Sequence, residues 1–372
     1  QVTDISKVGL NTHLRYFTKN KKTGKQMFRL GGFLSKVNLT QGYVVLNNGN
    51  LSWSVQLKDS IFFEKMTFTD FKKQLKKSFD NGNTWSTLKV IWDDGNNTCG
   101  NPSPVLDKNS GRISLLSTWN RGEDKEWQII DQKSIDTRRI FLIHSNNDGD
   151  SWTKPREITS DVKLSNWTWY ATGPVNGIQL KRGSNKGRLI IPCDHIEAKT
   201  KHYYSHIIYS DDGGLNWTLG GSTNQHQVNE CTIVELNSGE LLLNMRNYTD
   251  DRLRKLAVSQ DQGITWSDIY SHENLIEPIC QASMINIKRP FKKDLLAFSN
   301  PNSKQSREKM TIQFSSNNSK TWSKKILIHE GPSAYSNLVQ LNSSEIACLF
   351  EGGDNSPYEG IAYKKINLRT IK

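Results

Sequence analysis

Five side chains that could do chemistry stand at the edges of predicted strands and turns. Glu230 begins a strand, where its carboxylate can face a central pocket, and Arg246 ends a strongly apolar strand in a cation. Arg307 precedes another strand, Tyr335 lies in a Gly-Pro-Ser-x-Tyr turn, and Glu351 closes a hydrophobic strand. Guanidinium groups bind anions through charge-assisted hydrogen bonds. The clustered residues are Arg, Glu and Tyr rather than His, Cys and Asp ligand sets, so the sequence implies no metal and no organic cofactor.

The elements that would position these residues are marked by a recurring turn, Ser-x-Asp-x-Gly-x-Thr-Trp. Copies begin at Ser78, Ser145, Ser210 and Ser259, and a degenerate fifth copy begins at Ser315. The Asp or Asn hydrogen-bonds the backbone of its own turn, and Gly supplies a positive φ. The Trp lays a large apolar face on the neighbouring sheet. Each copy is therefore predicted to be a hairpin between two strands.

The spacing of the turns predicts the architecture. The Trp residues that close them are 49 to 67 positions apart, and short apolar strands with Gly, Asn and Asp turns fill the intervals. Units of about 60 residues with four strands each are typical of propeller blades. Dividing 372 residues into such units predicts an all-β, six-bladed β-propeller. A solenoid of hairpins is the alternative, but it would need polar capping repeats that the sequence lacks.

Composition favours a single globular chain. We find no long helix, no Pro- or Ser-rich linker and no break in composition, so we expect one domain over residues 1–372. No stretch of about 18 apolar residues occurs, so no transmembrane helix is predicted. The net charge is +12, but Lys and Arg are scattered, which favours a solvated lysine-rich surface over a nucleic-acid partner. An anionic substrate would benefit from the positive field.

Cysteine and sequon patterns bear on the compartment. The five cysteines are widely spaced without a CxxC, and we expect all of them to be buried small hydrophobic residues. Asn-x-Ser/Thr sequons occur at Asn38, Asn50, Asn96, Asn166, Asn216, Asn247, Asn317 and Asn342. Their number predicts a secreted or lumenal (lysosomal) glycoprotein.

The turns and the polar clusters together resemble the exo-α-sialidase (neuraminidase) family with Asp-box (BNR) repeats, of the cellular and bacterial type. The similarity runs from about residue 70 to the C-terminus, and several independent motifs follow in the family's order. Its densest segments are residues 101–105, 169–174 and 192–195, together with the Glu230, Arg246, Arg307 and Tyr335 motifs. The resemblance implies a glycoside hydrolase of the exo-α-sialidase class that acts on sialylated glycoproteins, glycolipids or oligosaccharides.

The same resemblance implies a role for each residue. Three arginines clamp the carboxylate of sialic acid in this family. Arg246 and Arg307 would be two of them, and Arg29 is the best counterpart of the first, with Glu351 to orient it. Tyr335 would be the nucleophile, because the substrate's carboxylate would repel a carboxylate nucleophile, and Glu230 would take its proton. Two further residues, Asp194 and His195, would line the pocket.

The proton donor is the open assignment. The family places an Asp about eleven residues before the Ser of the first turn, and counting back from Ser78 reaches Thr67, which cannot donate a proton at a useful pKa. Asp59 and Asp70 are the candidates. Two hypotheses follow: a retaining exo-α-sialidase with a displaced acid, and a lectin-like, sialic-acid-binding propeller that has lost leaving-group protonation.

Overall fold

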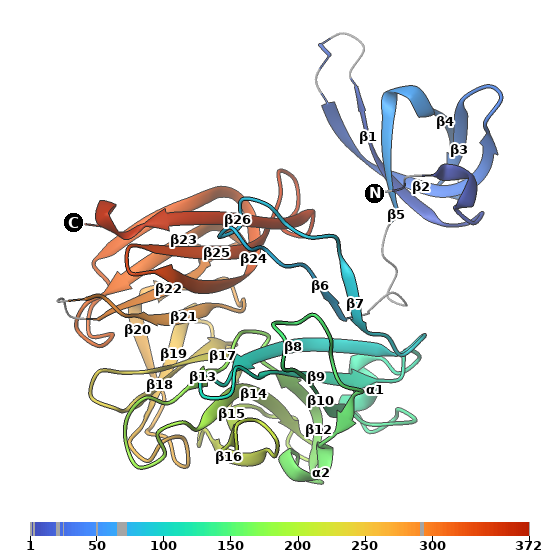
Figure 1. The fold of residues 1–372 in the computed structure, drawn as a ribbon. Coiled ribbons are helices and arrows are strands. Elements are labelled where there is room, and N and C mark those ends of the chain that lie inside the picture. The colour runs from blue at the N-terminus through green and yellow to red at the C-terminus, as the bar shows by residue number, and fades with distance from the viewer. Residues whose placement is uncertain are drawn as a thin grey trace. The chain divides into compact units, whose positions relative to one another are not determined.

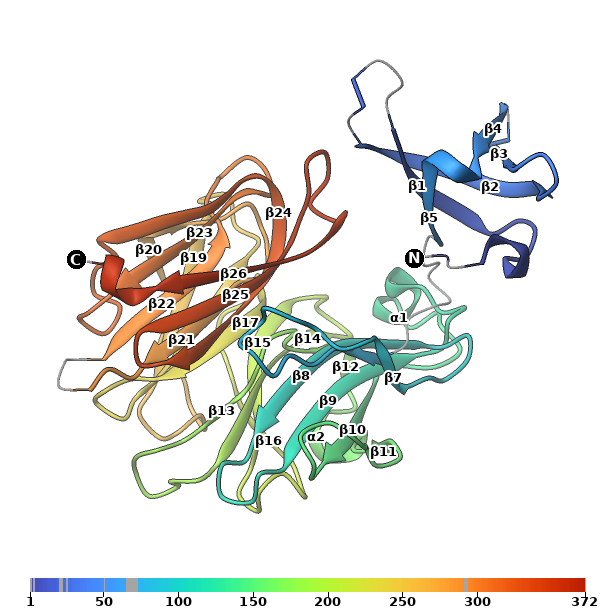
Figure 2. The ribbon, with the colours of Figure 1, turned by 45° about the horizontal axis from the view of Figure 1, so that its top comes forward.

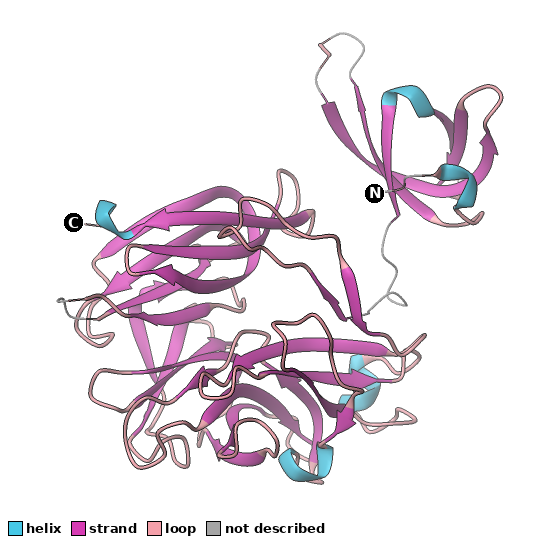
Figure 3. Ribbon diagram, in the orientation of Figure 1, coloured by secondary structure: helices cyan, strands magenta, loops and turns pink. Residues whose placement is uncertain are grey.

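The computed structural model describes residues 2, 4–19, 23–24, 26–49, 51–64, 73–290 and 294–371. The contacts between residues divide the chain into two compact units, residues 1–70 and 71–372. The sequence analysis expected one domain over residues 1–372. That expectation stays a prediction, and each unit is described by itself. Strands dominate both units, as the magenta ribbons in Figure 3 show, which confirms the all-β class.

The first unit is one antiparallel sheet with the strand order β4-β3-β2-β1-β5. Its described residues form η1 (Ile5–Lys7), β1 (His13–Lys19), β2 (Gln26–Asn38), β3 (Tyr43–Asn47), β4 (Ser52–Gln56), η2 (Leu57–Asp59) and β5 (Ser60–Glu64), where η marks a 3-10 helix. Alternate residues of these strands pack into one buried cluster that includes Leu14, Leu34 and Leu46. The period of two places these side chains on one face, which stabilises the sheet.

The second unit contains five sheets. The first sheet pairs β6 (Lys73–Leu75) with β7 (Lys89–Trp92), and the second contains β8 (Thr98–Leu106), β9 (Ile113–Asn120), β10 (Arg139–Ser145) and β11 (Arg156–Glu157). The third contains β12 (Trp167–Thr172), β13 (Ile178–Gln179), β14 (Leu189–Glu197), β15 (Tyr203–Ser210) and β16 (Thr218–Ser222). The fourth contains β17 (Val228–Glu235), β18 (Leu241–Asn247), β19 (Leu253–Ser259) and β20 (Tyr270–Ile276).

The last sheet comprises β21 (Ser283–Ile287), β22 (Leu295–Pro301), β23 (Glu308–Ser315), β24 (Lys324–Asn342), β25 (Glu345–Gly352) and β26 (Gly360–Asn367). The described part of the unit also contains the short helices α1 (Glu126–Ile130), α2 (Thr159–Val162) and η4 (Leu368–Thr370). Among the described residues, no helix has the length and apolar character needed to cross a bilayer.

Inner strands of successive sheets contact one another in chain order: β8 contacts β14, β14 contacts β17, and β17 contacts β21. Within the last sheet, β21 also contacts β24. In Figure 1 the colours of the second unit run in this order from β8 to β24. In the turned view of Figure 2, β17 again lies beside β14 and β15. Apolar clusters fill the space between neighbouring sheets. Sheets packed face to face in chain order are the arrangement of a β-propeller, while the number of six blades stays a prediction.

Each predicted turn joins two paired strands, which confirms the hairpin interpretation. The five turns lie between β6 and β7, β10 and β11, β15 and β16, β19 and β20, and β23 and β24. In the fourth copy, Asp261 accepts from the Thr265 backbone N–H at 2.8 Å and from the Thr265 hydroxyl at 2.6 Å. Gly263 adopts a φ of 96°, and Trp266 is buried.

The first copy of the turn differs from the others. Its sheet, β6 with β7, has two strands among the described residues, whereas the other copies belong to sheets of at least four. Trp85 is 42% exposed, while Trp217, Trp266 and Trp322 are at most 9% exposed. Instead of entering a core, the Trp85 ring meets the edge of Tyr363 at 5.5 Å. The sheet that carries the first turn is therefore small and partly uncovered.

We expect Asp261→Ala to lower the free energy of unfolding of the second unit by about 1–2 kcal/mol, because the turn loses its hydrogen-bond acceptor. Slight burial opposes ionisation, but the Thr265 hydrogen bonds lower the pKa of Asp261 to about 2. The carboxylate's contribution is therefore present above about pH 4 and is lost as the pH falls through 2. Urea denaturation at pH 7 and pH 3 measures both effects. Asp250→Ala, at an exposed position, is the control, and an equal loss in both variants would contradict this role.

Candidate functional site

Tyr335 and Glu230 meet although 105 residues separate them. The Tyr335 hydroxyl, on β24, donates a hydrogen bond to Glu230 Oε1, on β17, at 2.5 Å. Glu230 is 7% exposed. Burial and the Glu230 carboxylate raise the pKa of Tyr335 well above its ordinary value. The resting phenol is therefore protonated, and its proton already points at a carboxylate that can accept it.

Irregular strand pairing orients the side chains of Glu230 and Tyr335. The β17–β18 ladder shifts register between Val228 and Cys231, on either side of Glu230. The β24–β25 ladder shifts between Ser333 and Ser336, next to Tyr335. A β-bulge redirects the side chains of the strand that contains it and is common beside active sites. Both shifts thus occur where the strands present Glu230 and Tyr335 to each other.

Two arginines add positive charge to this pair. Arg246, at the end of β18, donates from Nη1 to Glu230 Oε2 at 2.6 Å and to the Tyr335 hydroxyl at 3.4 Å. Burial disfavours its charged form, but the Glu230 carboxylate outweighs this and raises the pKa of Arg246 above its ordinary value. The Arg307 guanidinium carbon lies 5.8 Å from the centre of the Tyr335 ring. Two permanent cations beside one phenol favour an anionic ligand.

Glu351, on β25, supports Tyr335 through the backbone. Its Oε2 accepts from the Tyr335 N–H at 3.2 Å. Burial raises the pKa of Glu351, although this hydrogen bond and Arg307 act in the opposite direction. No ion pair to Glu351 occurs within the described ranges. Its predicted partner Arg29 belongs to the first unit, so the orienting role of Glu351 toward that arginine stays a prediction.

Asp194 and His195 are both buried, with exposed fractions of 1% and 2%. Burial, and then the Glu230 charge, raise the pKa of Asp194 well above its ordinary value. The His195 ring stacks on Trp167 at 3.5 Å, and its Nδ1 lies 3.0 Å from His206 Nδ1. Burial lowers the pKa of His195 to about 3, so the ring is neutral at physiological pH. The structure shows packing for both residues, and their role in lining the pocket stays a prediction.

The remaining predicted residues precede the second unit. Arg29 is an exposed residue of β2, and Asp59 is an exposed residue of η2. Asp70 lies outside the described residues. The structure therefore brings together Tyr335, Glu230, Arg246, Arg307 and Glu351 from the predicted set, and the assignments of Arg29, Asp59 and Asp70 stay predictions.

Three contacts at the site were not predicted from the sequence. Arg307 donates to the Tyr358 hydroxyl at 2.6 Å and to the Ile279 carbonyl at 2.9 Å. The Tyr248 ring lies 5.0 Å from the Arg246 guanidinium carbon. Tyr248 follows the apolar strand that ends in Arg246, a signal that could have been used. A backbone carbonyl gives no such signal, because its direction depends on the fold.

The arrangement can hold an anionic group and deprotonate a phenol, but leaving-group protonation has no evident donor in it. Three described carboxylates belong to the group. Glu230 is bonded to Tyr335 and Arg246, Glu351 is bonded to a backbone N–H, and Asp194 is buried. Each is therefore already engaged or shielded from solvent. The geometry fits nucleophilic attack by Tyr335 better than it fits protonation of a departing oxygen.

Comparison with known proteins adds the family context. Residues 70–348 match the family described as BNR repeat-like domain. The sialidase of Bacteroides fragilis strain YCH46 is 29% identical over 349 residues, which cover 89% of this chain and 62% of that protein. Human sialidase-3 is 29% identical over 346 residues, covering 77% of this chain and 79% of its own length. This chain thus spans about three fifths of the Bacteroides sialidase.

Solved structures agree on the fold. The Hadza microbial sialidase Hz136 superposes with a TM-score of 0.72 at 28% identity, covering 80% of this chain and 60% of that one. Trypanosoma rangeli sialidase superposes with a TM-score of 0.65 over 95% of this chain and 58% of its own, at 19% identity. The match of the family over most of the chain, together with these relatives, accounts for the repeated turns and the all-β sheets.

Proposed function

The chain belongs to the BNR-repeat sialidase family, and from this premise we propose that it is a retaining exo-α-sialidase with Tyr335 as nucleophile. The observation that carries the proposal is the 2.5 Å hydrogen bond from the Tyr335 hydroxyl to Glu230, with Arg246 bonded to the same carboxylate. Terminal sialic acid on glycoproteins, glycolipids or oligosaccharides is the substrate. Arg246 and Arg307 bind its carboxylate, and this fixes the anomeric carbon beside the phenol.

In the proposed reaction, Glu230 takes the phenolic proton as the Tyr335 oxygen bonds to the anomeric carbon and the glycosidic C–O bond breaks. Because the site has no evident donor, the departing oxygen takes a proton from solvent. A water then attacks the same carbon and loses a proton to solvent as the Tyr335–carbon bond breaks, and Glu230 returns the phenolic proton to the Tyr335 oxygen. Two displacements restore the original anomeric configuration. A neutral phenol suits this site, because a carboxylate in its place would be repelled by the substrate's own carboxylate.

The lack of an evident proton donor for the leaving group supports a second candidate function. The engaged state of Glu230 and Glu351 and the burial of Asp194 favour a sialic-acid-binding propeller that has lost its general acid. Loss of a general acid costs about 10²–10⁴ in rate. A phenol-type leaving group needs little protonation, so the cost falls mainly on natural sialyl-galactosides.

Hydrolysis of an aryl sialoside beside a natural sialyl-galactoside tests this prediction. We expect turnover of the aryl compound, with the natural substrate slower by about 10²–10⁴ after correction for intrinsic reactivity. Comparable corrected rates would contradict acid loss and favour a displaced donor, which Asp59→Asn and Asp70→Asn would then test. Binding without turnover of either compound would contradict the enzyme and support the lectin-like alternative.

We also propose a compartment for the protein. The eight sequons support a secreted or lumenal protein. Asn247 is buried and donates its amide to Asp251 and to the Leu253 carbonyl at 2.9 Å, so this sequon is structural. Mass spectrometry of the secreted chain would identify which of the other asparagines carry glycans.

A further inference from the structure

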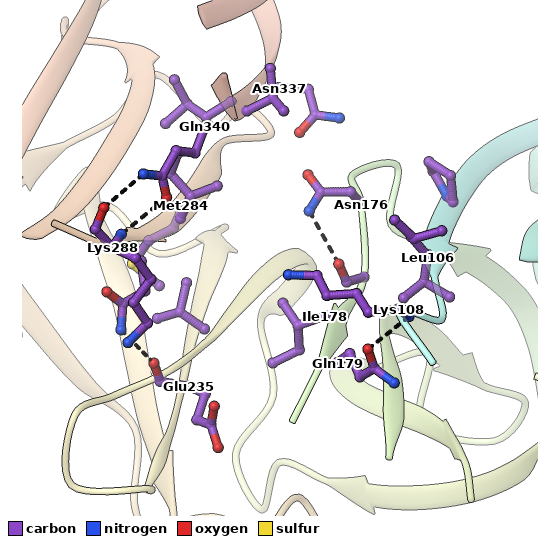
Figure 4. Close-up of a pocket in the computed structure, with 18 of the residues that line it drawn as sticks. Leu106, Lys108, Asn176, Ile178, Gln179, Glu235, Met284, Lys288, Asn337 and Gln340 are labelled. Atoms are coloured by element: carbon purple, nitrogen blue, oxygen red, sulfur yellow. Dashed lines mark hydrogen bonds between the residues drawn. The ribbon is translucent and has the colours of Figure 1, made fainter. Parts of the chain in front are cut away.

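A second cavity lies in the second unit, apart from the Tyr335 site. Its volume is about 630 Å³, which is within the range of small-molecule sites. The lining comes from the ends of β8, β13, β17, β21 and β24, and Figure 4 shows its side chains on two facing walls. Cations, amides and apolar side chains all contribute, so the cavity can make each kind of contact that a polar organic ligand requires.

Two strands carry both sites and show that the sites are separate. Glu230 and Glu235 lie five residues apart on β17, and Tyr335 and Gln340 lie five residues apart on β24. The first residue of each pair belongs to the Tyr335 site and the second lines the cavity. Five residues of strand span about 16 Å. The lining on β24 begins at Asn337, two residues after Tyr335, and extends along the strand away from the phenol to Gln340.

Three lysines give the cavity its positive charge, Lys108, Lys181 and Lys288. Burial lowers the pKa of Lys181, and the charges of Lys108 and Lys288 lower it further. The Lys181 ammonium group thus has two like charges as neighbours, which Glu235 and Asp294 partly offset, and an anion beside it would relieve the remaining repulsion. Lys288 is also paired with Asp294.

Acidic residues limit the charge that the cavity can accept. Glu235 and Asp148 also line it and Asp294 is paired with Lys288, so the formal charges balance, and Lys108 and Lys181 are the lysines of the lining that form no ion pair among the described residues. Glu235 accepts from the backbone N–H groups of Lys181 at 3.0 Å and Arg182 at 2.9 Å, which hold its carboxylate in place. Two lysines without ion pairs, beside carboxylates that repel further negative charge, favour a ligand with a single carboxylate over a polyphosphate.

Amide side chains fix the backbone around two of the lysines. Gln340 accepts from the Lys288 N–H at 3.0 Å and donates to the Lys288 carbonyl at 2.8 Å. Gln179 accepts from the Lys108 N–H at 2.9 Å, and Figure 4 shows this bond. Such bonds order the lysine backbones before any ligand arrives, which lowers the entropic cost of binding.

Other polar and apolar side chains of the cavity could contact the uncharged part of a ligand. Asn286 Oδ1 is buried and has no hydrogen-bond partner among the described residues, while its amide donates to the Glu235 carbonyl at 2.8 Å. An unpartnered buried acceptor is costly, and because this oxygen is closed to solvent, a ligand hydroxyl reaches it only after the Asn286 side chain moves. Ile178 and Met284 supply apolar surface. Hydroxyl partners beside apolar surface and a cation suit a sugar ring that carries an acid group.

We propose that this cavity is a second ligand site, which binds an acidic saccharide through Lys108 and Lys181. The site needs nothing from Tyr335 or the two arginines, so the proposal stands or falls separately from the proposed function. A saccharide bound there would lie along β17 and β24, away from the reacting phenol.

Isothermal titration of the Tyr335→Phe chain with 3′-sialyllactose tests the second site, because this variant holds the ligand without turnover. We expect two binding events. Adding Lys108→Met and Lys181→Met should weaken one event at least tenfold and leave the other unchanged, whereas adding Arg246→Met should do the reverse. Lys320→Met with Lys364→Met, two exposed lysines, is the matched control.

A single event that only Arg246→Met removes would overturn the second site and leave the proposed function intact. A single event that only the Lys108 and Lys181 changes remove would support the second site and contradict sialic-acid binding beside Tyr335. Thermal unfolding of every variant checks its fold, and an unfolded variant is replaced by Lys108→Gln with Lys181→Gln.

Discussion

Replacing Tyr335 with Phe is expected to lower kcat for an aryl sialoside at least about 10³-fold, the scale on which enzymes lose activity without their nucleophile. The change removes one oxygen atom and keeps the ring, so packing around β24 is preserved. It also frees Glu230 Oε1 from its 2.5 Å bond, while Arg246 stays bonded to Oε2. Binding of sialic acid to the arginines should therefore persist. Steady-state kinetics and a separate binding titration measure the two effects.

The control for this variant is Tyr270→Phe, an exposed tyrosine on β20. It loses the same atom and should leave kcat unchanged. Full activity of the Tyr335 variant would overturn its assignment as nucleophile. A parallel loss in both variants would point to a general effect of the substitution on the fold, which circular dichroism would reveal.

Local signals predicted most of the second unit. The Ser-x-Asp-x-Gly-x-Thr-Trp turn is specified by its own residues, since Asp261 and its equivalents bond within eight positions of chain. Such turns can be found without knowing the rest of the fold. The strands between them follow from alternating apolar residues. The hairpins, the buried Trp residues and the burial of all five cysteines were therefore accessible from the sequence.

The separate sheet of the first unit was not accessible in the same way. Residues 13–64 alternate as strands do in the second unit, and no linker composition marks a boundary. Alternation of apolar and polar residues indicates that a segment is a strand, but it does not indicate which sheet the strand joins.

The boundary between the two units affects the residues whose roles at the site remain predictions. In the β8–β11 and β17–β20 sheets, the repeated turn joins the third and fourth strands. By that pattern β6 and β7 occupy the third and fourth positions of their own sheet, and the described residues provide no first and second strands for it. The resemblance places the first arginine and the acid before the first turn, which is the region where the second unit begins. The roles of Arg29, Asp59 and Asp70 depend on this boundary.

Side-chain identity at the site followed from the resemblance, and the geometry followed from the fold. Tyr335 and Glu230 carry no local signal of their partnership, because 105 residues separate them. The register shifts that aim them arise from pairing between strands and cannot be read from one strand. The Ile279 carbonyl that holds Arg307 belongs to a residue with a φ of 56°, which is uncommon for a β-branched side chain.

A fully buried ion pair connects the stability of the second unit to this geometry. Arg254 and Glu277 are both 0% exposed and meet at 2.8 Å. Glu277 also accepts from the Asn247 N–H at 2.7 Å, next to Arg246. Arg254 donates to the Cys280 carbonyl at 2.7 Å, next to the Ile279 carbonyl that holds Arg307. One pair thus supports the backbone beside both arginines of the site.

Arg254→Met is expected to lower the free energy of unfolding of the second unit by about 3–5 kcal/mol, because it leaves the Glu277 carboxylate buried without its cation. Arg254→Met with Glu277→Gln should be less destabilised than Arg254→Met alone, since the double change removes that uncompensated charge. Arg139→Met is the control, because Arg139 forms exposed pairs whose loss costs about 1 kcal/mol or less. Guanidinium denaturation measures all three variants.

The same substitution should weaken sialic-acid binding in molecules that remain folded, because the backbone beside Arg246 and Arg307 loses its anchor. Titration with 3′-sialyllactose at a temperature well below the unfolding midpoint separates this effect from stability. A large loss of stability with unchanged binding would show that the pair only supports the core. A loss no greater than that of Arg139→Met would contradict the role of Arg254 altogether, since a buried carboxylate without its cation cannot be tolerated at so small a cost.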